Sequence, residues 1–260
     1  MIKKAVYSQW SKPANDSHIG FNSKKAFYNC ALLSLINSKK WFEEVELITD
    51  EEGYNLLIKE LQLPFDSVKV ELDSLNYIDK KHWAIGKLKA CSLQDTPFMH
   101  LDFDVIWFKR PPDYLLNAEA CFQNIEEGHV FNEWYRGYIK DAVDQKVNNY
   151  FSTEDNYAYN CGFMGFNNLN IIDEWYNSAL DFIDKFKSNK KNLVTSLLFE
   201  QYAIYKLCEL NNYKVEIIEE AYKDEVTTKY GYTHLLSVVK RRKDIEEKVK
   251  KKLEKELNLI

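Results

Sequence analysis

Hydrophobic and polar positions follow two alternating periods along residues 1–112. Short apolar, β-prone runs predict strands at 5–10, 44–50, 67–73 and 98–108. Between these runs, apolar residues recur at helical spacing and predict helices at 23–39, 51–63 and 83–94. Because predicted strands and helices alternate, this half of the chain indicates an α/β fold with a mostly parallel sheet flanked by helices.

The pattern is less regular after Pro111 and Pro112. Apolar runs predict strands at 128–135, 160–168 and 213–219, with a polar stretch at about 137–156. Amphipathic spacing predicts helices at 171–187 and 192–210, and a loop is expected at 230–237. The chain shows no internal repeat or low-complexity linker, so we expect residues 1–239 to form a single domain.

Residues 240–260 form a charged tail with an apolar row at Ile245, Val249, Leu253 and Leu257. The tail carries a net charge of about +4, against a total of −5 for the chain. This pattern predicts a basic C-terminal helix that packs on the domain through one stripe. The alternative is a surface helix that contacts anionic lipid.

Composition narrows the class of protein. A net charge of −5 argues against a nucleic-acid binder. Five widely spaced cysteines without a C-x-x-C pair suggest reduced thiols rather than disulfides or a zinc site. No signal peptide or long apolar span is evident, so we expect a soluble, cytoplasmic protein.

The most informative stretch is PFMHLDFDVIWFKRPP, residues 97–112, where Asp102 and Asp104 end a buried apolar run. Ligands of open α/β sheets bind beyond the carboxyl ends of strands. Strand residues two apart point to the same side, so both carboxylates should face one small region. Such a pair is unfavourable unless a cation neutralises it, which predicts a site for Mg²⁺ or Mn²⁺. The alternative is a solvated acidic turn.

Two metal-dependent classes use this pattern. Phosphatases of the haloacid dehalogenase type also end a strand in D-x-D, and "DFDV" fits them locally. Their motif usually opens the core domain, whereas here three predicted strands precede it. They also need a downstream acidic pair, and no G-D-x-x-x-D element follows Asp104.

The second class is the GT-A glycosyltransferases, which the chain resembles over most of its length. "DFD" at 102–104 looks like their D-x-D motif, and "YNCGFMGFN" at 159–167 is similar to a segment of glycosyltransferase family 8. "FEQYAIYKL" at 199–207 resembles their D-Q-D helix start, with Glu200 where Asp is usual, and "YTHLLSVVK" at 232–240 resembles a late His-containing segment. The chain also looks like a group of bacterial proteins of this type without an assigned reaction.

The resemblance implies a metal site and a sugar site. Asp104, Asp102 and His234 would ligate Mn²⁺ or Mg²⁺, Asp102 would also contact the nucleotide ribose, and Lys240 could pair with a phosphate. Residues expected beside the sugar are Asn160, Cys161, Gly162, Glu200 and Gln201, with Gly162 allowing close backbone approach. Asn160, Glu200 and Gln201 are the candidate catalytic residues.

For the nucleotide, the resemblance implies a binding half at 1–112 and a half for sugar and acceptor at 113–239. Tyr7 and Trp10 could stack on the base, Asp50 could bind base or ribose, and Lys87 could lie near the diphosphate.

These features predict a metal-dependent glycosyltransferase that moves a sugar from a nucleotide-diphosphate sugar to an acceptor hydroxyl. By analogy, the acceptor would be a glycan or lipid-linked glycan of bacterial surface polysaccharide or glycolipid synthesis, and the reaction would retain configuration. A basic tail that contacts the inner face of the membrane would suit such an acceptor. The alternatives are a non-catalytic nucleotide-sugar or glycan-binding protein on the same fold, and the phosphatase.

Overall fold

The computed structural model describes residues 1–13, 20–187, 194–218, 229–236 and 239–258. Its centre is a mixed seven-stranded sheet with strand order β3-β2-β1-β4-β7-β6-β8. The strands are β1 (Lys4–Gln9), β2 (Glu44–Thr49), β3 (Ser67–Val70), β4 (Phe98–Leu101), β6 (Ala120–Glu126), β7 (Ala158–Phe166) and β8 (Val215–Ile217). Strands β1 to β4 pair in parallel and β7 runs antiparallel to β4 and β6. The predicted α/β class with a mostly parallel sheet is confirmed, and both halves of the chain contribute to one sheet.

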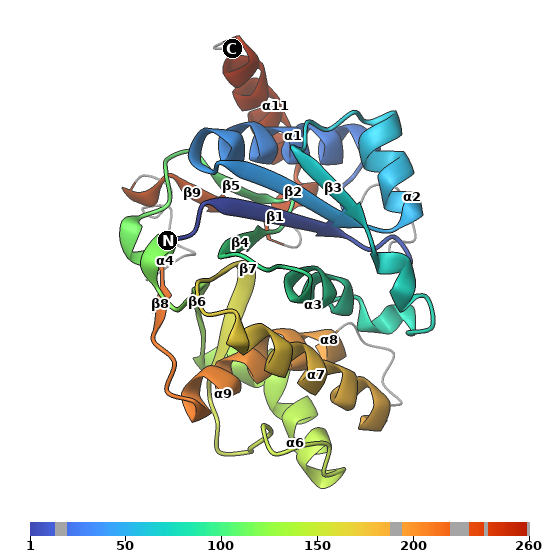
Figure 1. Cartoon of the computed structure of the whole chain (residues 1–260), viewed down its shortest axis with the longest axis vertical. Coiled ribbons are helices and arrows are strands. Elements are labelled where there is room, and N and C mark those ends of the chain that lie inside the picture. The colour runs from blue at the N-terminus through green and yellow to red at the C-terminus, as the bar shows by residue number, and fades with distance from the viewer. Residues whose placement is uncertain (14–19, 188–193, 219–228, 237–238, 259–260) are drawn as a thin grey trace.

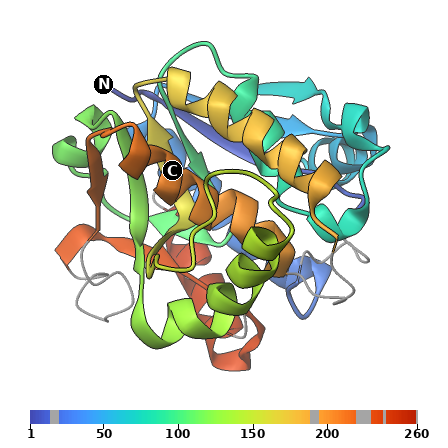
Figure 2. The ribbon, with the colours of Figure 1, turned by 90° about the horizontal axis from the view of Figure 1, so that it is seen from below.

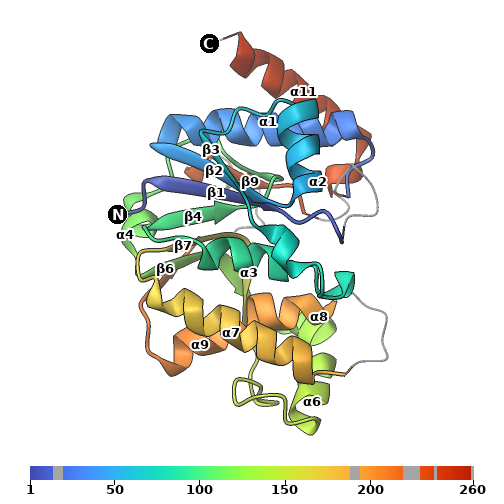
Figure 3. The ribbon, with the colours of Figure 1, turned by 45° about the vertical axis from the view of Figure 1, so that its right-hand side comes forward.

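Helices cover both faces of the sheet (Figures 1 and 3). One face carries α1 (Lys24–Trp41), α2 (Glu51–Tyr54) with the π-helical η1 (Asn55–Glu60), and α11 (Lys243–Leu257). The other carries α3 (Ile85–Ser92), α7 (Asn170–Lys185), and a run of α8 (Val194–Leu197), η5 (Leu198–Tyr202) and α9 (Ala203–Leu210). In Figure 2 the gold α7 and the orange α8–α9 run lie side by side.

Shorter segments connect these layers. Three of them are 3-10 helices, η2 (Leu72–Leu75), η3 (Lys80–His82) and η6 (Val239–Arg241), and α4 (Asp113–Asn117) leads into β6. Helices α5 (Gly128–Phe131), η4 (Asn132–Arg136) and α6 (Gly137–Asp144) follow one another without a break between β6 and β7. A separate two-stranded antiparallel sheet pairs β5 (Val105–Trp107) with β9 (Tyr232–His234).

The prediction was wrong between β6 and α6. The sequence predicted a strand at 128–135 and no regular structure at 137–156, whereas the chain is helical from Gly128 to Asp144 and the strand lies earlier, in β6. Val, Phe, Trp and Tyr are β-prone, and this propensity suggested a strand. The side chains that the fold buries are Phe131, Tyr135 and Tyr138, whose spacing is helical, so packing overrides propensity here.

The C-terminal helix packs on α1, as its apolar row predicted. Val249 and Leu253 are buried, and Lys40 Nζ of α1 lies 2.5 Å from Glu256 Oε2. Several lysines of α11 pair with acidic residues one turn away, among them Lys248 with Asp244 and Lys250 with Glu254. Among the described residues, no helix is both long and apolar enough to span a bilayer.

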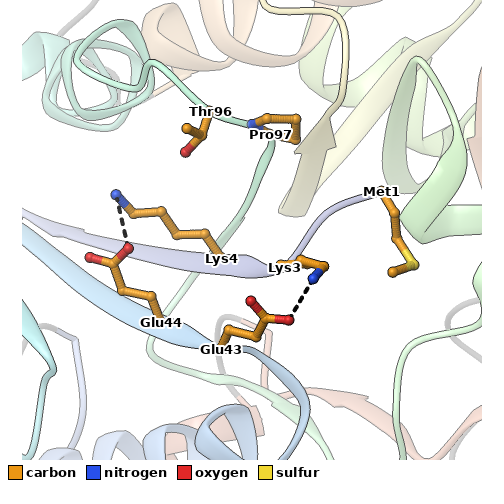
Figure 4. A pocket seen from close by; sticks show the side chains of 7 residues that line it. All are labelled: Met1, Lys3, Lys4, Glu43, Glu44, Thr96 and Pro97. Atoms are coloured by element: carbon orange, nitrogen blue, oxygen red, sulfur yellow. Dashed lines mark ion pairs between the residues drawn. The ribbon is translucent and has the colours of Figure 1, made fainter.

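A pocket lies where β1 and β2 begin (Figure 4). It is lined by Met1, Lys3, Lys4, Glu43, Glu44, Thr96 and Pro97. Lys3 Nζ lies 2.7 Å from Glu43 Oε1, and Lys4 Nζ lies 3.8 Å from Glu44 Oε2. Its charged side chains thus neutralise one another.

Candidate functional site

The two aspartates of the D-x-D motif lie in a turn where the chain changes sheets. β4 ends at Leu101 and β5 begins at Val105, so the single strand predicted at 98–108 is two strands. Three backbone hydrogen bonds fix the turn. Within it, Val105 N donates to Asp102 O at 3.0 Å. From outside it, Gly162 O accepts from Asp102 N at 3.0 Å and Leu235 N donates to Asp104 O at 2.9 Å. Both carboxylates meet in one region as predicted, but through this turn rather than through strand alternation.

Pairing of β9 with β5 brings a histidine to the same place. His234 lies opposite Val105 in the register, directly beyond Asp104. One ligand atom from each of Asp102, Asp104 and His234 lies within 4.8 Å of the others, and His234 Nε2 is 3.4 Å from Asp104 Oδ1. Of the described residues, these three form the one such group of metal-ligating side chains.

The other ring nitrogen of His234 faces an acceptor. His234 Nδ1 lies 2.7 Å from Gln123 Oε1, and the Tyr232 hydroxyl donates to the same oxygen at 2.5 Å. With Nδ1 donating this hydrogen bond, Nε2 is the ring nitrogen that would bind a cation, in place of any proton that it carries in the metal-free protein. Two carboxylates and an imidazole nitrogen that converge in this way fit a divalent cation such as Mn²⁺ or Mg²⁺.

Gly162 makes room for this histidine. A Cβ on Gly162 would lie 2.4 Å from Gln123 Oε1 and 2.4 Å from His234 Nδ1. The sequence predicted that Gly162 allows a sugar to approach the backbone, whereas in the structure the space above it is filled by His234 and Gln123. Gln123 lies at a β-bulge in β6, where the register shifts between Phe122 and Asn124.

Lys240 reaches the same site from the start of the C-terminal segment. Its Nζ lies 2.9 Å from Asp104 Oδ2 and 5.2 Å from the centre of the Phe21 ring. Burial alone would raise the pKa of the Asp104 carboxyl, but attraction to His234 and Lys240 outweighs burial and holds that pKa well below its usual range. Asp104 is therefore ionised at neutral pH, and Lys240 supplies part of the positive charge that stabilises it.

A second lysine holds Asp102. Lys87 Nζ lies 2.8 Å from Asp102 Oδ1 and 2.6 Å from Glu200 Oε1, and it donates to the Cys161 carbonyl at 3.1 Å. Burial would lower the pKa of the Lys87 ammonium, but Asp102 and Glu200 outweigh it and hold that pKa above its usual range. The lysine was predicted beside a diphosphate, but its three contacts direct it to protein oxygens.

Glu200, the second carboxylate that Lys87 contacts, is fully buried. Burial, opposed by Lys87, raises the pKa of Glu200 to about 7. Its Oε2 has no hydrogen-bond partner in the described part of the chain. A buried carboxyl with an unsatisfied oxygen is costly, which is typical of a functional group rather than of a structural one.

A polar network next to Glu200 contains two residues that the sequence did not reveal. Asn160 Nδ2 donates to Glu126 Oε1 at 2.7 Å, and Asn160 Oδ1 accepts from Gly162 N at 3.0 Å. The Tyr135 hydroxyl lies between Glu126 Oε2 and the Gln201 side-chain oxygen. Glu126 and Tyr135 thus link Asn160 to Gln201, and neither of them lies in a motif that could have indicated it.

The side chains of four residues that were predicted to contact a ligand are buried. Tyr7 lies beneath α1, where its hydroxyl forms hydrogen bonds with Ser34 and Ser38. Trp10 is buried with its Cβ 2.7 Å from where a Cβ on Gly86 would lie. Asp50 accepts from Gly53 N at 2.8 Å and caps α2, and the Cys161 thiol is fully buried.

Several solved structures are similar to this chain. The galactosyltransferase LgtC, solved with donor and acceptor sugar analogues, matches with a TM-score of 0.50 and 10% identity over 97% of this chain and 95% of its own. An inositol-1-phosphate CTP transferase from T. maritima matches with a TM-score of 0.45 and 12% identity over 97% and 96% of the two chains. Mouse xyloside xylosyltransferase 1 matches with a TM-score of 0.45 and 12% identity over 93% and 94%.

At this identity the likeness to LgtC shows the fold, and the predicted GT-A-type fold is confirmed. No curated protein is significantly similar to the sequence. The profile of one family, described as a family of unknown function, DUF6734, matches residues 3–258. The chain therefore belongs to the DUF6734 family.

Proposed function

We propose that the protein transfers a sugar from a nucleotide-diphosphate sugar to an acceptor hydroxyl, with Mn²⁺ or Mg²⁺ bound by Asp102, Asp104 and His234. The observation that supports this most directly is the convergence of these three side chains at the carboxyl end of β4 in a GT-A-type fold. A divalent cation at this position would neutralise negative charge on the diphosphate as the glycosidic bond breaks.

The neighbouring residues have separate tasks in this proposal. Asp104 is held ionised by Lys240 and His234, so it is ready to bind a cation at neutral pH. When a cation binds to Asp104, Lys240 is released and can pair with a phosphate, as the sequence suggested. Gln123 fixes the ring of His234, and Lys87 fixes Asp102, which is the more exposed of the two aspartates.

The sugar side of the site is formed by Asn160, Gln201 and Glu200. Amide side chains suit sugar hydroxyls because they both donate and accept hydrogen bonds. The Glu200 carboxyl, beside Asp102 and Lys87, would stabilise positive charge that develops on the sugar in an oxocarbenium-like transition state.

The proposal is tested by isothermal titration of UDP, GDP, CDP, ADP and dTDP into the protein with Mn²⁺ and with a chelator. We expect one nucleoside diphosphate to bind only with Mn²⁺, and Asp104→Asn to weaken this binding at least about 100-fold, because a direct metal ligand is lost. Glu43→Gln, which removes a carboxylate at the other end of the sheet, should bind like the wild type.

The same protein samples separate the alternatives. Binding of a nucleotide sugar without release of nucleoside diphosphate, with acceptor sugars present, would indicate a non-catalytic binding protein. Hydrolysis of p-nitrophenyl phosphate that requires Asp102 would indicate the phosphatase. Absence of metal-dependent binding for all five nucleoside diphosphates would contradict the proposal.

A further inference from the structure

Gln123 is a fully buried glutamine whose two amide atoms have different surroundings. Its Oε1 accepts two hydrogen bonds, from His234 Nδ1 at 2.7 Å and from the Tyr232 hydroxyl at 2.5 Å. Its Nε2 has no hydrogen-bond partner among the residues that the structure describes. Because a buried amide nitrogen without a partner is costly, the acceptor oxygen is the feature that explains a glutamine at this position.

The backbone around Gln123 makes room for its contact with the histidine. The pairing of β6 with β7 shifts its register here, so that Gln123 lies opposite residues 161–163 of β7. Gly162 is the middle residue of that bulge, and a Cβ on it would lie 2.4 Å from both Gln123 Oε1 and His234 Nδ1. Bulges re-aim side chains, and this one brings the amide oxygen to the imidazole ring.

The second donor to Gln123 is itself held in place by aromatic packing. The ring centre of Tyr232 lies 4.7 Å from that of Trp107 and 5.4 Å from that of Phe163, and all three rings are buried. The Tyr232 hydroxyl therefore reaches Gln123 Oε1 from a fixed position. With this donor on one side, the oxygen presents a fixed acceptor to His234 Nδ1, which leaves Nε2 as the ring atom on the metal side.

The partner of His234 is neutral, although a carboxylate is common behind a metal-binding histidine. Asp102 and Asp104 already supply two carboxylates for a divalent cation. A third carboxylate behind the imidazole would hold the cation more firmly, but it would also repel the phosphates of a nucleoside diphosphate. An amide orients the ring without adding that charge.

Resting on the proposed function, we propose that Gln123 is a positioning residue of the metal site with two tasks. Its oxygen fixes His234 with Nε2 toward the cation, and its lack of charge preserves the attraction of the bound cation for a diphosphate. The first task concerns the metal alone, whereas the second takes effect when a nucleotide binds. The two tasks are therefore measured separately.

The first measurement is Mn²⁺ binding without nucleotide, from the electron paramagnetic resonance signal of free Mn²⁺. Gln123→Met removes the acceptor at nearly constant size and should weaken binding about 10- to 100-fold. Gln123→Glu restores an acceptor oxygen and should bind Mn²⁺ at least as tightly as the wild type. A merely structural role would not give this recovery, because a buried carboxylate fits an apolar interior less well than methionine does.

The second measurement is isothermal titration of the preferred nucleoside diphosphate into each protein with its metal site saturated by Mn²⁺. Gln123→Met should bind it within about threefold of the wild type, because the cation is in place and no charge has been added. Gln123→Glu should bind it about tenfold more weakly, because the added carboxylate repels the phosphates. The two variants thus reverse their order between the two measurements.

Gln94→Met is the matched control, because it removes a buried glutamine at the other end of the sheet. Gln94 Nε2 donates to Glu46 Oε2 at 3.0 Å and to the Ala90 carbonyl at 3.2 Å, far along the chain from the metal ligands. Gln94→Met should bind Mn²⁺ and the nucleoside diphosphate like the wild type. Loss of Mn²⁺ binding in this control equal to that in Gln123→Met would overturn the positioning role, since general destabilisation would then explain both.

Two results would overturn the inference while leaving the proposed function intact. One is wild-type Mn²⁺ affinity in Gln123→Met, and the other is wild-type affinity for the nucleoside diphosphate in Gln123→Glu. If urea unfolding shows that Gln123→Met does not fold, Gln123→Glu decides alone, and Mn²⁺ binding weaker than that of the wild type would overturn the inference. Failure of all five nucleoside diphosphates to bind the wild type with Mn²⁺ would instead contradict the proposed function, and the Mn²⁺ measurement would still test the positioning of His234.

Discussion

Both ends of the seven-stranded sheet carry clusters of charged side chains, and the two clusters differ in how their charges are paired. At the amino ends of β1 and β2, Lys3 pairs with Glu43 at 2.7 Å, and Lys4 pairs with the buried Glu46 at 2.8 Å. Lys69 adds a second cation to Glu46 at 3.2 Å. Each carboxylate there has a lysine of its own.

At the other end, within the part of the chain that the structure describes, the carboxylates outnumber the lysines. Asp102 and Glu200 share Lys87, while Asp104 has Lys240. Glu126 adds a further carboxylate, which contacts Asn160 and Tyr135. The comparison shows that a dense group of charges is not by itself a sign of function. A surplus of one sign among the described residues is more informative, because it favours binding of a cation.

The largest expected effect is on the free energy of unfolding, whose pH dependence should change when Glu200 is replaced. The pKa of this carboxyl rises from about 4.5 in the unfolded chain to about 7 in the folded protein. Below about pH 4.5 both states hold the proton, and between about pH 4.5 and 7 the unfolded state alone releases it, so the folded protein loses up to about 3 kcal/mol of stability. Glu200→Gln lacks this loss.

The measurement is the free energy of unfolding by urea at about pH 5 and about pH 8, with a chelator present. Relative to the wild type, Glu200→Gln should gain about 3 kcal/mol over this interval. The matched control is Glu46→Gln at the opposite end. Burial would raise the pKa of Glu46, but hydrogen bonds from Lys4 and Gln94 outweigh it and lower that pKa, so its contribution is present throughout this interval and is lost only at lower pH. A constant difference for Glu200→Gln would contradict the raised pKa.

A smaller effect is expected at Lys240, which competes with a metal ion for Asp104. Lys240→Met should bind Mn²⁺ about tenfold more tightly than the wild type in the absence of nucleotide, because the ion no longer has to displace an ammonium group. Binding is measured from the electron paramagnetic resonance signal of free Mn²⁺. Lys69→Met, which removes a lysine from the cluster at the amino ends of β1 and β2, should leave Mn²⁺ binding unchanged. Weaker binding by Lys240→Met would show that Lys240 supports the metal site rather than competing for it.

The smallest effect is expected at the exposed pair of Lys3 and Glu43, whose side chains are 55% and 69% exposed. Glu43→Gln should change the free energy of unfolding by less than about 0.5 kcal/mol, since solvent screens exposed ion pairs. Chemical denaturation at neutral pH checks this value. A change above about 2 kcal/mol would mean that the pair of Lys3 and Glu43 stabilises the fold more than its exposure implies.

The sequence predicted the first half of the fold well, because alternating strands and helices leave a clear periodic pattern. It also indicated Asp102, Asp104 and His234, since each lies in a motif. It did not predict that Asp102 and Asp104 lie in a turn between two sheets, because that turn is held by Gly162 and Leu235, which are distant in sequence.

The residues that the sequence missed have positions set by tertiary structure alone. Glu126 reaches the site because β6 pairs with β7, and the sequence did not predict β6. Tyr135 reaches it from a helix that the sequence suggested was a strand. Tyr7 was expected beside the nucleotide because it lies near the carboxyl end of β1. Strand alternation instead directs its side chain into the core beneath α1.

The central claim, that a divalent cation compensates the surplus of carboxylates at the carboxyl end of the sheet, is tested most directly by anomalous X-ray diffraction. Crystals grown with Mn²⁺ and the nucleoside diphosphate that binds would be measured at the manganese absorption edge. The account predicts an anomalous peak bonded to Asp104 and His234, with Asp102 adjacent and Lys240 moved away from Asp104. Bound nucleotide without a manganese peak at these residues, with Lys240 still paired to Asp104, would contradict it.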